Sequence, residues 1–291
     1  MRTIGYLPFI KAFVSRRRPV YAHYAVTGRC NLRCRTCAIW KNADPDNELP
    51  IEKVEELAGI LRKLGVVQVS LGGGEPAVRS DLPELVGAFL RHGIRARVLT
   101  NGVAMTPEIV DRLLLVGMRE VSFSLDSLNP EVQKFLDGGT EAFAQRIDNL
   151  LYLAKMLPRT DCLGLLNTVV SPLNLMELPR LLAFAESIGF SISYIPVHLA
   201  ADDDHAHRFY GHDRRLRFAE ERQDDLHRVY DELMRAKKRG RPIVNSSAFL
   251  RRSPDFLLRG VADWPCRAGQ WYFSIAPDGR VSPCHAFENR W

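Results

Sequence analysis

Three cysteines lie close together near the start of this 291-residue chain, at Cys30, Cys34 and Cys37. Their spacing is C-x3-C-x2-C, and they follow a short apolar run at residues 21–26 that predicts a β-strand. A [4Fe–4S] cluster normally takes four cysteine ligands, so three thiolates on one loop would leave one iron with an open coordination position. A metal site with an open position is generally catalytic rather than structural. The spacing therefore indicates an iron–sulfur centre that takes part in chemistry.

Two other uses of clustered cysteines are less well supported. A structural zinc ion needs four protein ligands, often as two pairs, and the next cysteine after this group is Cys162. A disulfide framework is uncommon in a chain of this length, in which we expect no secretion signal. The iron–sulfur interpretation is favoured, and a zinc site remains its alternative. Cys162 itself stands beside an apolar run and is expected to be a small buried residue without chemistry.

The rest of the chain alternates predicted strands with predicted helices. After the first strand, we expect strands at residues 66–71, 94–99, 120–125, 163–170 and 191–197. Apolar residues at helical spacing predict helices at 51–64, 82–92, 107–115, 143–157 and 174–188. This alternation is typical of an α/β fold with a parallel sheet. Parallel barrels place their sites at the carboxyl ends of the strands, so the polar residues that follow the strands would face one mouth.

Two polar groups follow predicted strands. Gly73, Gly74 and Glu75 come directly after the second strand, where glycines allow positive φ and close approach of a ligand to the backbone, although a plain turn would also use them. Ser124 and Asp126 alternate at the end of the fourth strand and so share one face. Their short side chains suit the diol of a ribose, and a polar strand end with an Asp cap is the alternative.

The C-x3-C-x2-C motif after a first strand resembles the cluster motif of the radical S-adenosylmethionine (SAM) superfamily, over about residues 20–200. The resemblance implies a partial (β/α)6 TIM-like barrel with a [4Fe–4S] cluster on Cys30, Cys34 and Cys37, whose open iron binds SAM. The Gly-Gly-Glu-Pro element resembles the family's amino-group site. Gly73, Gly74 and Glu75 are then expected to bind the amino group of SAM.

The resemblance extends to the fourth strand, where Ser124 and Asp126 would contact the ribose or carboxylate of SAM. Asn101, in the Thr-Asn-Gly element after the third strand, would lie at the barrel mouth without touching the cofactor. The chain departs from the family at two places. Thr36 stands where an aromatic residue is common, so Trp40 is the nearest aromatic candidate to pack against adenine, and residues 129–139 lack a His-Asp pair often found there.

The C-terminal part carries two more cysteines, Cys266 and Cys284, around a turn at Asp278-Gly279 that predicts a hairpin. This resembles the start of the SPASM or twitch extension, which holds auxiliary iron–sulfur clusters, so both cysteines are candidate metal ligands. The further cysteines of that extension are missing before the last residue, Trp291. A fragment of a longer protein is favoured over other ligands, such as His285, and over a hairpin without a cluster.

These features divide the chain into four predicted parts. Residues 1–20 form an N-terminal arm, 21–200 the core barrel, 201–240 a linker and connecting helix, and 241–291 a SPASM-like extension that we expect to be incomplete. The linker is rich in Asp and His at residues 202–212, where a solvated segment is favoured over a metal site.

Composition limits the partners. The net charge of +6 and pI of about 9.1 are mild, and no basic run alternates with aromatics, so we expect no nucleic acid. The apolar stretch near the N-terminus is too short for a transmembrane segment, and cysteines available for metal suggest a reducing compartment, so we expect a cytoplasmic protein.

The resemblance implies that one electron, from a flavodoxin- or ferredoxin-type donor, cleaves SAM to methionine and a 5′-deoxyadenosyl radical, which abstracts hydrogen from a substrate. The SPASM-like extension favours a peptide substrate in a maturation reaction. The same chemistry on a sugar, nucleoside or other small metabolite is the alternative. A zinc-stabilised, non-catalytic binding module is the alternative of another class. No catalytic side chain is assigned by the sequence.

Overall fold

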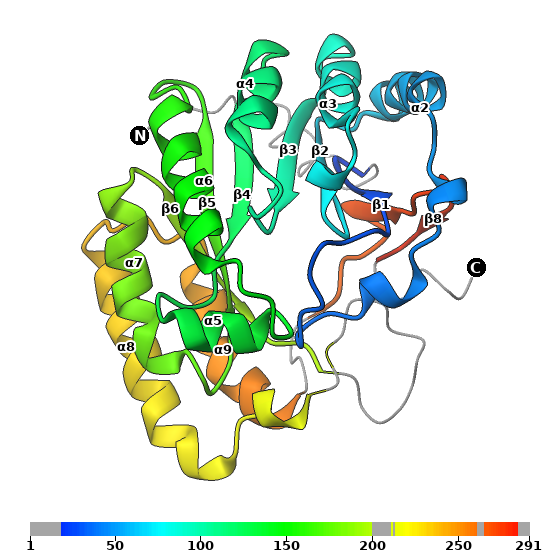
Figure 1. Cartoon of the computed structure of the whole chain (residues 1–291). Helices are drawn as coiled ribbons and strands as arrows, with labels where there is room; N and C mark the ends of the chain where they lie inside the picture. Colours follow the sequence, from blue (N-terminus) through cyan, green and yellow to red (C-terminus); the bar gives the residue numbers. More distant parts are fainter. Residues whose placement is uncertain (1–18, 200–210, 212, 261–264, 285–291) are drawn as a thin grey trace.

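The computed structural model describes residues 19–199, 211, 213–260 and 265–284. Most of the predicted N-terminal arm, nearly all of the linker at 201–212, and His285 lie outside these residues. The described chain forms one mixed α/β unit around a curved sheet (Figure 1).

The sheet has eight strands in the order β6-β5-β4-β3-β2-β1-β7-β8. Every neighbouring pair is parallel except β7 and β8, which are antiparallel. In the described chain β6 and β8 are its two edges, so the sheet is not closed. The strands are β1 (Tyr21–Thr27), β2 (Gln68–Gly73), β3 (Arg95–Thr100), β4 (Glu120–Ser124), β5 (Leu163–Val170), β6 (Ser191–Pro196), β7 (Tyr272–Ile275) and β8 (Val281–Ser282). The predicted α/β class and partial barrel are confirmed.

Helices cover the outer face of the sheet. Figure 1 shows α2, α3, α4 and α6 along one side of it, with α7 and α8 following. The helices are α2 (Ile51–Leu64), α3 (Leu82–Arg91), α4 (Pro107–Leu115), α5 (Pro130–Leu136), α6 (Phe143–Met156), α7 (Leu178–Ser187), α8 (Gln223–Lys238) and α9 (Ser247–Arg259). Short 3-10 turns lie at Ile39–Asn42, Pro45–Asn47, Pro76–Val78, Leu175–Glu177, Arg214–Leu216 and Glu220–Arg222.

Local sequence explains where several elements begin and end. Helix α2 starts after Pro50 and ends just before Gly65, whose φ of 93° is left-handed and therefore suits glycine. The helix predicted from Asn174 begins later, at Leu178, after a 3-10 turn. The Asn174 side chain does not cap the helix, because it donates to the carbonyls of Asp126 and Val169 at 2.6 and 2.8 Å.

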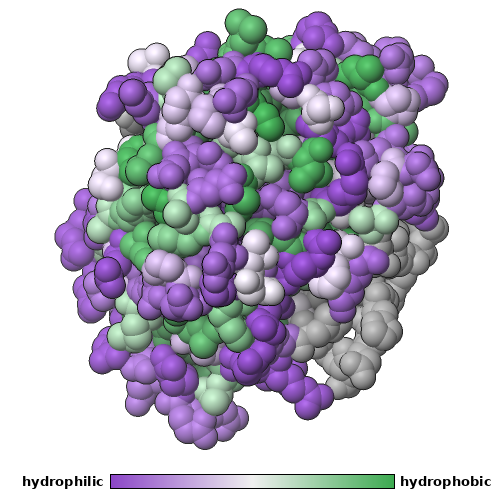
Figure 2. Space-filling model, in the orientation of Figure 1, coloured by the Kyte–Doolittle hydropathy of each residue, from purple (hydrophilic) through white to green (hydrophobic). Residues whose placement is uncertain are grey.

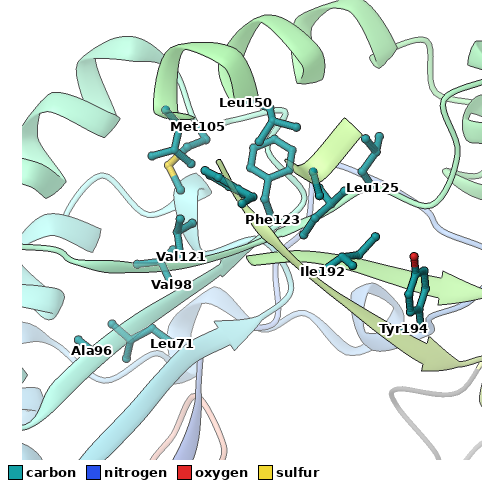
Figure 3. Close-up of a cluster of buried hydrophobic side chains, with 14 of the residues drawn as sticks. Leu71, Ala96, Val98, Met105, Val121, Phe123, Leu125, Leu150, Ile192 and Tyr194 are labelled. Carbon is teal, nitrogen blue, oxygen red and sulfur yellow. The ribbon is translucent and has the colours of Figure 1, made fainter. Parts of the chain in front are cut away.

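The core lies between the sheet and its helices. Tyr24, Leu71, Val98 and Val121 stand side by side in one register row across β1 to β4, and all four are fully buried. Figure 3 shows Leu71, Val98 and Val121 of this row, together with Phe123 beneath Leu150 of α6. Because side chains alternate along a strand, the residues directly before and after each of these four point to the opposite, concave face of the sheet. The face of the molecule shown in Figure 2 is mainly polar, with small apolar patches.

The C-terminal hairpin belongs to the same sheet. Strand β7 pairs in parallel with β1, and Asp278-Gly279 forms the turn into β8, with φ of 87° at Gly279. Helix α9 packs against α8, and its Leu250 joins the main core. The predicted division into four parts stays a prediction. None of the described helices is both long and apolar enough to cross a membrane.

Segment 241–245 covers the outer edge of β6. The main-chain N–H of Val244 donates to the carbonyl of Ile192 at 2.9 Å. The Asn245 side chain makes the hydrogen bonds that a neighbouring strand would make. Its Oδ1 accepts from the Tyr194 N–H at 2.7 Å, and its Nδ2 donates to the Tyr194 carbonyl at 3.0 Å. These contacts satisfy main-chain groups of an edge strand that would otherwise be open to pairing.

Replacing Asn245 with alanine is expected to lower the free energy of unfolding by about 1–3 kcal/mol, because main-chain groups of the buried Tyr194 lose their partners. Anaerobic urea unfolding measures the change. Val244→Ala is the matched control, since Val244 is 47% exposed and its main-chain bond remains, and it should change stability by less than about 0.5 kcal/mol. Equal losses in the two variants would contradict this role of Asn245.

Candidate metal and cofactor site

The three predicted cluster ligands lie on the cysteine loop, which we define as residues 28–38, at the carboxyl end of β1. Their thiols are near enough to influence each other electrostatically. Burial raises the pKa of Cys34 well above its usual range, and Asp137, Cys37 and Cys30 raise it further. Burial also raises the pKa of Cys37 to about 11 and, to a smaller extent, that of Cys30.

These thiols fit an iron–sulfur cluster. Raised pKa values favour the neutral thiols in the absence of metal, and a bound metal would keep them as thiolates and release their protons. The donor set is all sulfur, which is the usual ligand of iron–sulfur clusters. Within the described part of the chain, no group of three or more His, Cys, Asp or Glu residues is arranged to hold a single metal ion.

The cysteine loop is held from one side by the end of α5. The Arg35 N–H donates to the carbonyl of Leu136 at 2.9 Å, and the Arg33 N–H donates to that of Asp137 at 3.4 Å. A Cβ on Gly138 would lie 2.1 Å from the Arg33 carbonyl oxygen, so only glycine allows this approach. Figure 1 shows α5 near the loop that follows β1.

A second contact comes from the segment after β6. A Cβ on Gly211 would lie 2.4 Å from the carbonyl oxygen of Arg35. The Arg35 guanidinium pairs with Asp213 at 3.1 Å and lies over the Phe135 ring, 4.3 Å from its centroid. The loop therefore lies between α5 on one side and Gly211 and Asp213 on the other.

The glycines after β2 are needed for contact with the cysteine loop. The N–H of Gly74 donates to the Thr27 carbonyl at 2.8 Å, and that of Glu75 donates to the Arg29 carbonyl at 2.9 Å. A Cβ on Gly73 would lie 2.3 Å from the Thr27 oxygen, and one on Gly74 would lie 2.0 Å from the Arg29 oxygen. Packing of two chain segments thus accounts for both glycines, and their contact with SAM stays a prediction.

Glu75 is fully buried and joins the ends of β2 and β3. Its carboxylate accepts hydrogen bonds from Thr100 Oγ1 at 2.7 Å, the Asn101 N–H at 2.6 Å and the Ala77 N–H at 3.0 Å. Burial raises the pKa of Glu75, and these three hydrogen bonds and Arg146 act against that rise. Its predicted bond to the amino group of SAM stays a prediction.

Ser124 and Asp126 end β4 in different environments. Ser124 is exposed, whereas Asp126 is half-buried and its Oδ1 accepts from the Val169 N–H at 2.7 Å. Burial raises the pKa of Asp126 to about 7, and the nearby Asp137 adds to the rise. Their contacts with SAM also stay predictions.

Asn101 lies beside the cysteine loop, and its expected place at the barrel mouth without contact to the cofactor stays a prediction. Its Nδ2 donates to Asn31 Oδ1 at 2.8 Å and lies 3.8 Å from Cys30 Sγ. Trp40 also reaches the loop, because its Nε1 donates to the Cys37 carbonyl at 3.1 Å, with the Arg33 guanidinium 5.0 Å from the ring centroid. Packing of Trp40 against adenine stays a prediction.

Three residues of this site were missed by sequence reasoning: Gln133, Asp137 and Arg146. Gln133 Oε1 accepts from the main-chain N–H groups of Asp126 and Ser127, and its Nε2 donates to Asp137 Oδ1 at 3.0 Å. Arg146 lies in a helix with an ordinary amphipathic pattern, where a basic residue predicts an exposed side chain. No sequence signal marked it as buried.

The two C-terminal cysteines lie at either end of the hairpin, with Cys266 exposed and Cys284 half-buried. A Cβ on Gly269 would come within 3.5 Å of the Pro283 side chain, so the segment after Cys266 lies against the segment before Cys284. Their role as metal ligands stays a prediction.

Comparison with known proteins decides the family. The model of the radical SAM superfamily matches residues 24–185, which is more than half of the chain. The chain belongs to the radical SAM superfamily. This superfamily uses a [4Fe–4S] cluster and SAM, so the cofactors implied by the three cysteines are those of the family.

Two curated relatives are similar in sequence. The PqqA peptide cyclase of Ruegeria pomeroyi is 30% identical over 284 residues, covering 93% of this chain and 68% of the relative. The AdoMet-dependent heme synthase of Methanosarcina barkeri is 29% identical over 167 residues, covering 57% of this chain and 47% of the relative. The chain therefore spans between about half and two thirds of the length of these relatives.

Solved structures share the fold. SuiB of Streptococcus suis, bound to S-adenosylmethionine, has a TM-score of 0.71 at 18% identity, over 94% of this chain and 62% of that chain. The structure of anSMEcpe with bound AdoMet has a TM-score of 0.68 at 16% identity, over 93% of this chain and 72% of that chain. These structures confirm the partial barrel.

Alanine substitutions at Gly138 and Gly139 distinguish two effects on stability. Both substitutions strain a backbone with positive φ, but only the one at Gly138 also disturbs the contact with the cysteine loop. Both glycines have positive φ, 80° and 97°, so each substitution costs about 1–2 kcal/mol of stability. A Cβ at 139 meets no described atom within 4 Å, whereas the one at 138 meets the Arg33 carbonyl, which adds about 1–3 kcal/mol. Urea unfolding and bound iron per chain are measured. Gly139→Ala should retain wild-type iron and Gly138→Ala should lose it, and equal retention would contradict the contact.

The raised pKa of Asp126 predicts a pH-dependent stability of the cluster-free protein. The pKa of Asp126 in the folded state, about 7, lies above its ordinary value of 3.8. The fold therefore favours the protonated carboxyl. Its contribution to the free energy of unfolding is fully present below about pH 4 and is lost as the pH rises toward 7. Asp126→Asn removes this loss and keeps an acceptor for the Val169 N–H. The variant should gain on the order of 1 kcal/mol relative to wild type between pH 5 and 7.5, in anaerobic urea unfolding. If the difference in the free energy of unfolding between variant and wild type stays constant over this pH range, the raised pKa of Asp126 is contradicted. The exposed Asp148→Asn serves as control.

Proposed function

We propose that Cys30, Cys34 and Cys37 ligate the [4Fe–4S] cluster of this enzyme and that its substrate is a peptide undergoing maturation. The single observation that carries the peptide proposal is the 30% identity to a peptide cyclase over 93% of the chain. SuiB bound to its precursor peptide, which has the same fold with a TM-score of 0.72, is in keeping with it.

When bound, the cluster supplies one electron that cleaves SAM to methionine and a 5′-deoxyadenosyl radical, which abstracts hydrogen from the substrate. The chain's own residues position the cofactors. Gly73, Gly74 and Glu75 would offer main-chain and carboxylate acceptors to the amino group of SAM, and Ser124 and Asp126 would bind its ribose or carboxylate. Glu75 also joins the ends of β2 and β3, which would hold this cofactor region rigid.

The concave face of the sheet supports a peptide substrate. Ser124, Asn167 and Ser193 lie side by side in register across β4, β5 and β6, so the row begins at a proposed SAM contact and continues away from it. Ser124 is exposed and the other two are half-buried. Hydroxyl and amide groups can both donate and accept, so this row can bind the amide groups of a peptide main chain.

Several wider assignments belong to the same proposal. A flavodoxin- or ferredoxin-type protein would supply the electron, and the protein would work in the cytoplasm. Residues 241–291 would be the start of a SPASM-like extension, in which Cys266 and Cys284 bind an auxiliary iron–sulfur cluster. The close approach of the segments that carry these two cysteines is in keeping with a shared site.

Iron and sulfide content after anaerobic reconstitution tests the cluster. The Cys30/Cys34/Cys37→Ala triple variant should lose about four irons per chain and all SAM cleavage, because a [4Fe–4S] cluster cannot form on the remaining loop. Cys162→Ala is the control and should retain both. About four irons that persist in the triple variant would support the auxiliary cluster. Zinc in place of iron, unchanged by the triple substitution, would contradict the proposal and favour a zinc-stabilised module.

A small-metabolite substrate is the second candidate, because the heme synthase relative is 29% identical over 57% of this chain. The two candidates separate by deuterium transfer. The reconstituted enzyme is given SAM, reductant and a deuterium-labelled cell extract divided into a peptide fraction and a small-molecule fraction. Deuterium should enter 5′-deoxyadenosine from the peptide fraction. Label from the small-molecule fraction alone would favour a metabolite substrate.

A further inference from the structure

A buried ion pair lies behind the cysteine loop and takes no part in the assignments above. Asp137 caps the C-terminus of α5, and Arg146 lies in the first half of α6. Their side chains are only 4% and 1% exposed, and Arg146 Nη1 lies 2.8 Å from Asp137 Oδ2. Neither of these two atoms has an aligned hydrogen bond to any described residue, so the contact is electrostatic.

Asp137 connects the pair to Cys34. Its Oδ1 lies 4.0 Å from Cys34 Sγ and also accepts a hydrogen bond from Gln133 Nε2 at 3.0 Å. Its main-chain carbonyl accepts from the N–H of Arg33, the residue directly before Cys34. The position of this carboxylate and the position of Cys34 are therefore coupled through both side chain and backbone.

Arg146 connects the pair to Cys30. Its Nε donates to the main-chain carbonyl of Asn101 at 2.9 Å, and Asn101 Nδ2 lies 3.8 Å from Cys30 Sγ. The Asn101 N–H also donates to the buried carboxylate of Glu75. One ion pair thus links the surroundings of two proposed cluster ligands that stand on the same loop.

We propose that Asp137 and Arg146 are positioning residues that hold Cys34 and Cys30 in place, and that their opposite charges shift the reduction potential of the cluster in opposite directions. This rests on the proposed function, since it requires a cluster on these cysteines. Reduction adds one electron from an external reductant to the cluster and its thiolates, with no bond made or broken. In a buried site, a nearby negative charge disfavours that electron and a nearby positive charge favours it. The two charges of the pair largely cancel.

Charge-neutral variants separate this electrostatic role from a merely structural one. Asp137→Asn, Arg146→Gln and the double variant are reconstituted as full-length holoenzyme, and the midpoint potential is measured by dithionite titration with EPR detection. Asp137→Asn should raise the potential, Arg146→Gln should lower it, and the double variant should return close to wild type. A loss of rigidity alone would move both single variants in the same direction.

A matched control uses another buried carboxylate at the opposite end of β4. Glu120 is 2% exposed and pairs with Arg95 and Arg97. Glu120→Gln should leave the potential unchanged. Shifts of equal sign in the two single variants, or no shift with iron retained, would overturn the proposal.

If the single variants lose iron, the double variant, which has no unpaired buried charge, should regain it. A double variant that also lacks iron would overturn the proposal as well. Wild-type protein that binds no iron–sulfur cluster would instead overturn the proposed function, so the two failures are distinguishable.

Discussion

The close contact between the cysteine loop and its neighbouring backbone is the constraint on which the site depends. Glycines at 73 and 74 approach the carbonyls of Thr27 and Arg29 more closely than any Cβ would allow. On the other side, carbonyls at the end of α5 accept N–H groups of the loop. Because neighbouring segments bind these main-chain groups, they help to keep the loop in a single conformation. The cysteine side chains can then serve a bound metal rather than the fold.

Charge is the second feature of the site. Burial raises the pKa values of the cysteine thiols, and the carboxylates of Asp126 and Asp137 add negative charge close to them. Arg146 is the buried cation that faces these groups within the described chain. A cluster bound on these cysteines would bring further negative charge, so in the proposed function nearby charged side chains would influence its electronic properties. The cofactors supply the radical chemistry, and the protein supplies their position and electrostatic surroundings.

The residues proposed for substrate binding and those proposed for cofactor binding overlap only at Ser124. The motifs that identify the family lie at the carboxyl ends of β1, β2 and β4, whereas the polar row of Ser124, Asn167 and Ser193 runs across β4 to β6. The addition of β7 beside β1 extends the sheet on the opposite side. The family motifs therefore lie near one part of the sheet, and in the proposed function Asn167 and Ser193 extend from them along the concave face.

The sequence by itself determined the order of strands and helices and the family, because these depend on local periodicity, on glycines and on closely spaced cysteines. It did not reveal α5, α9 or the pairing of β7 with β1. It also did not show that Asp137 approaches Cys34, 103 positions away, or that Asn101 approaches Cys30, 71 positions away. Such contacts form only when the sheet brings distant segments together. A buried charge such as Arg146 has the same local pattern as an exposed one, so only the tertiary structure decides its role.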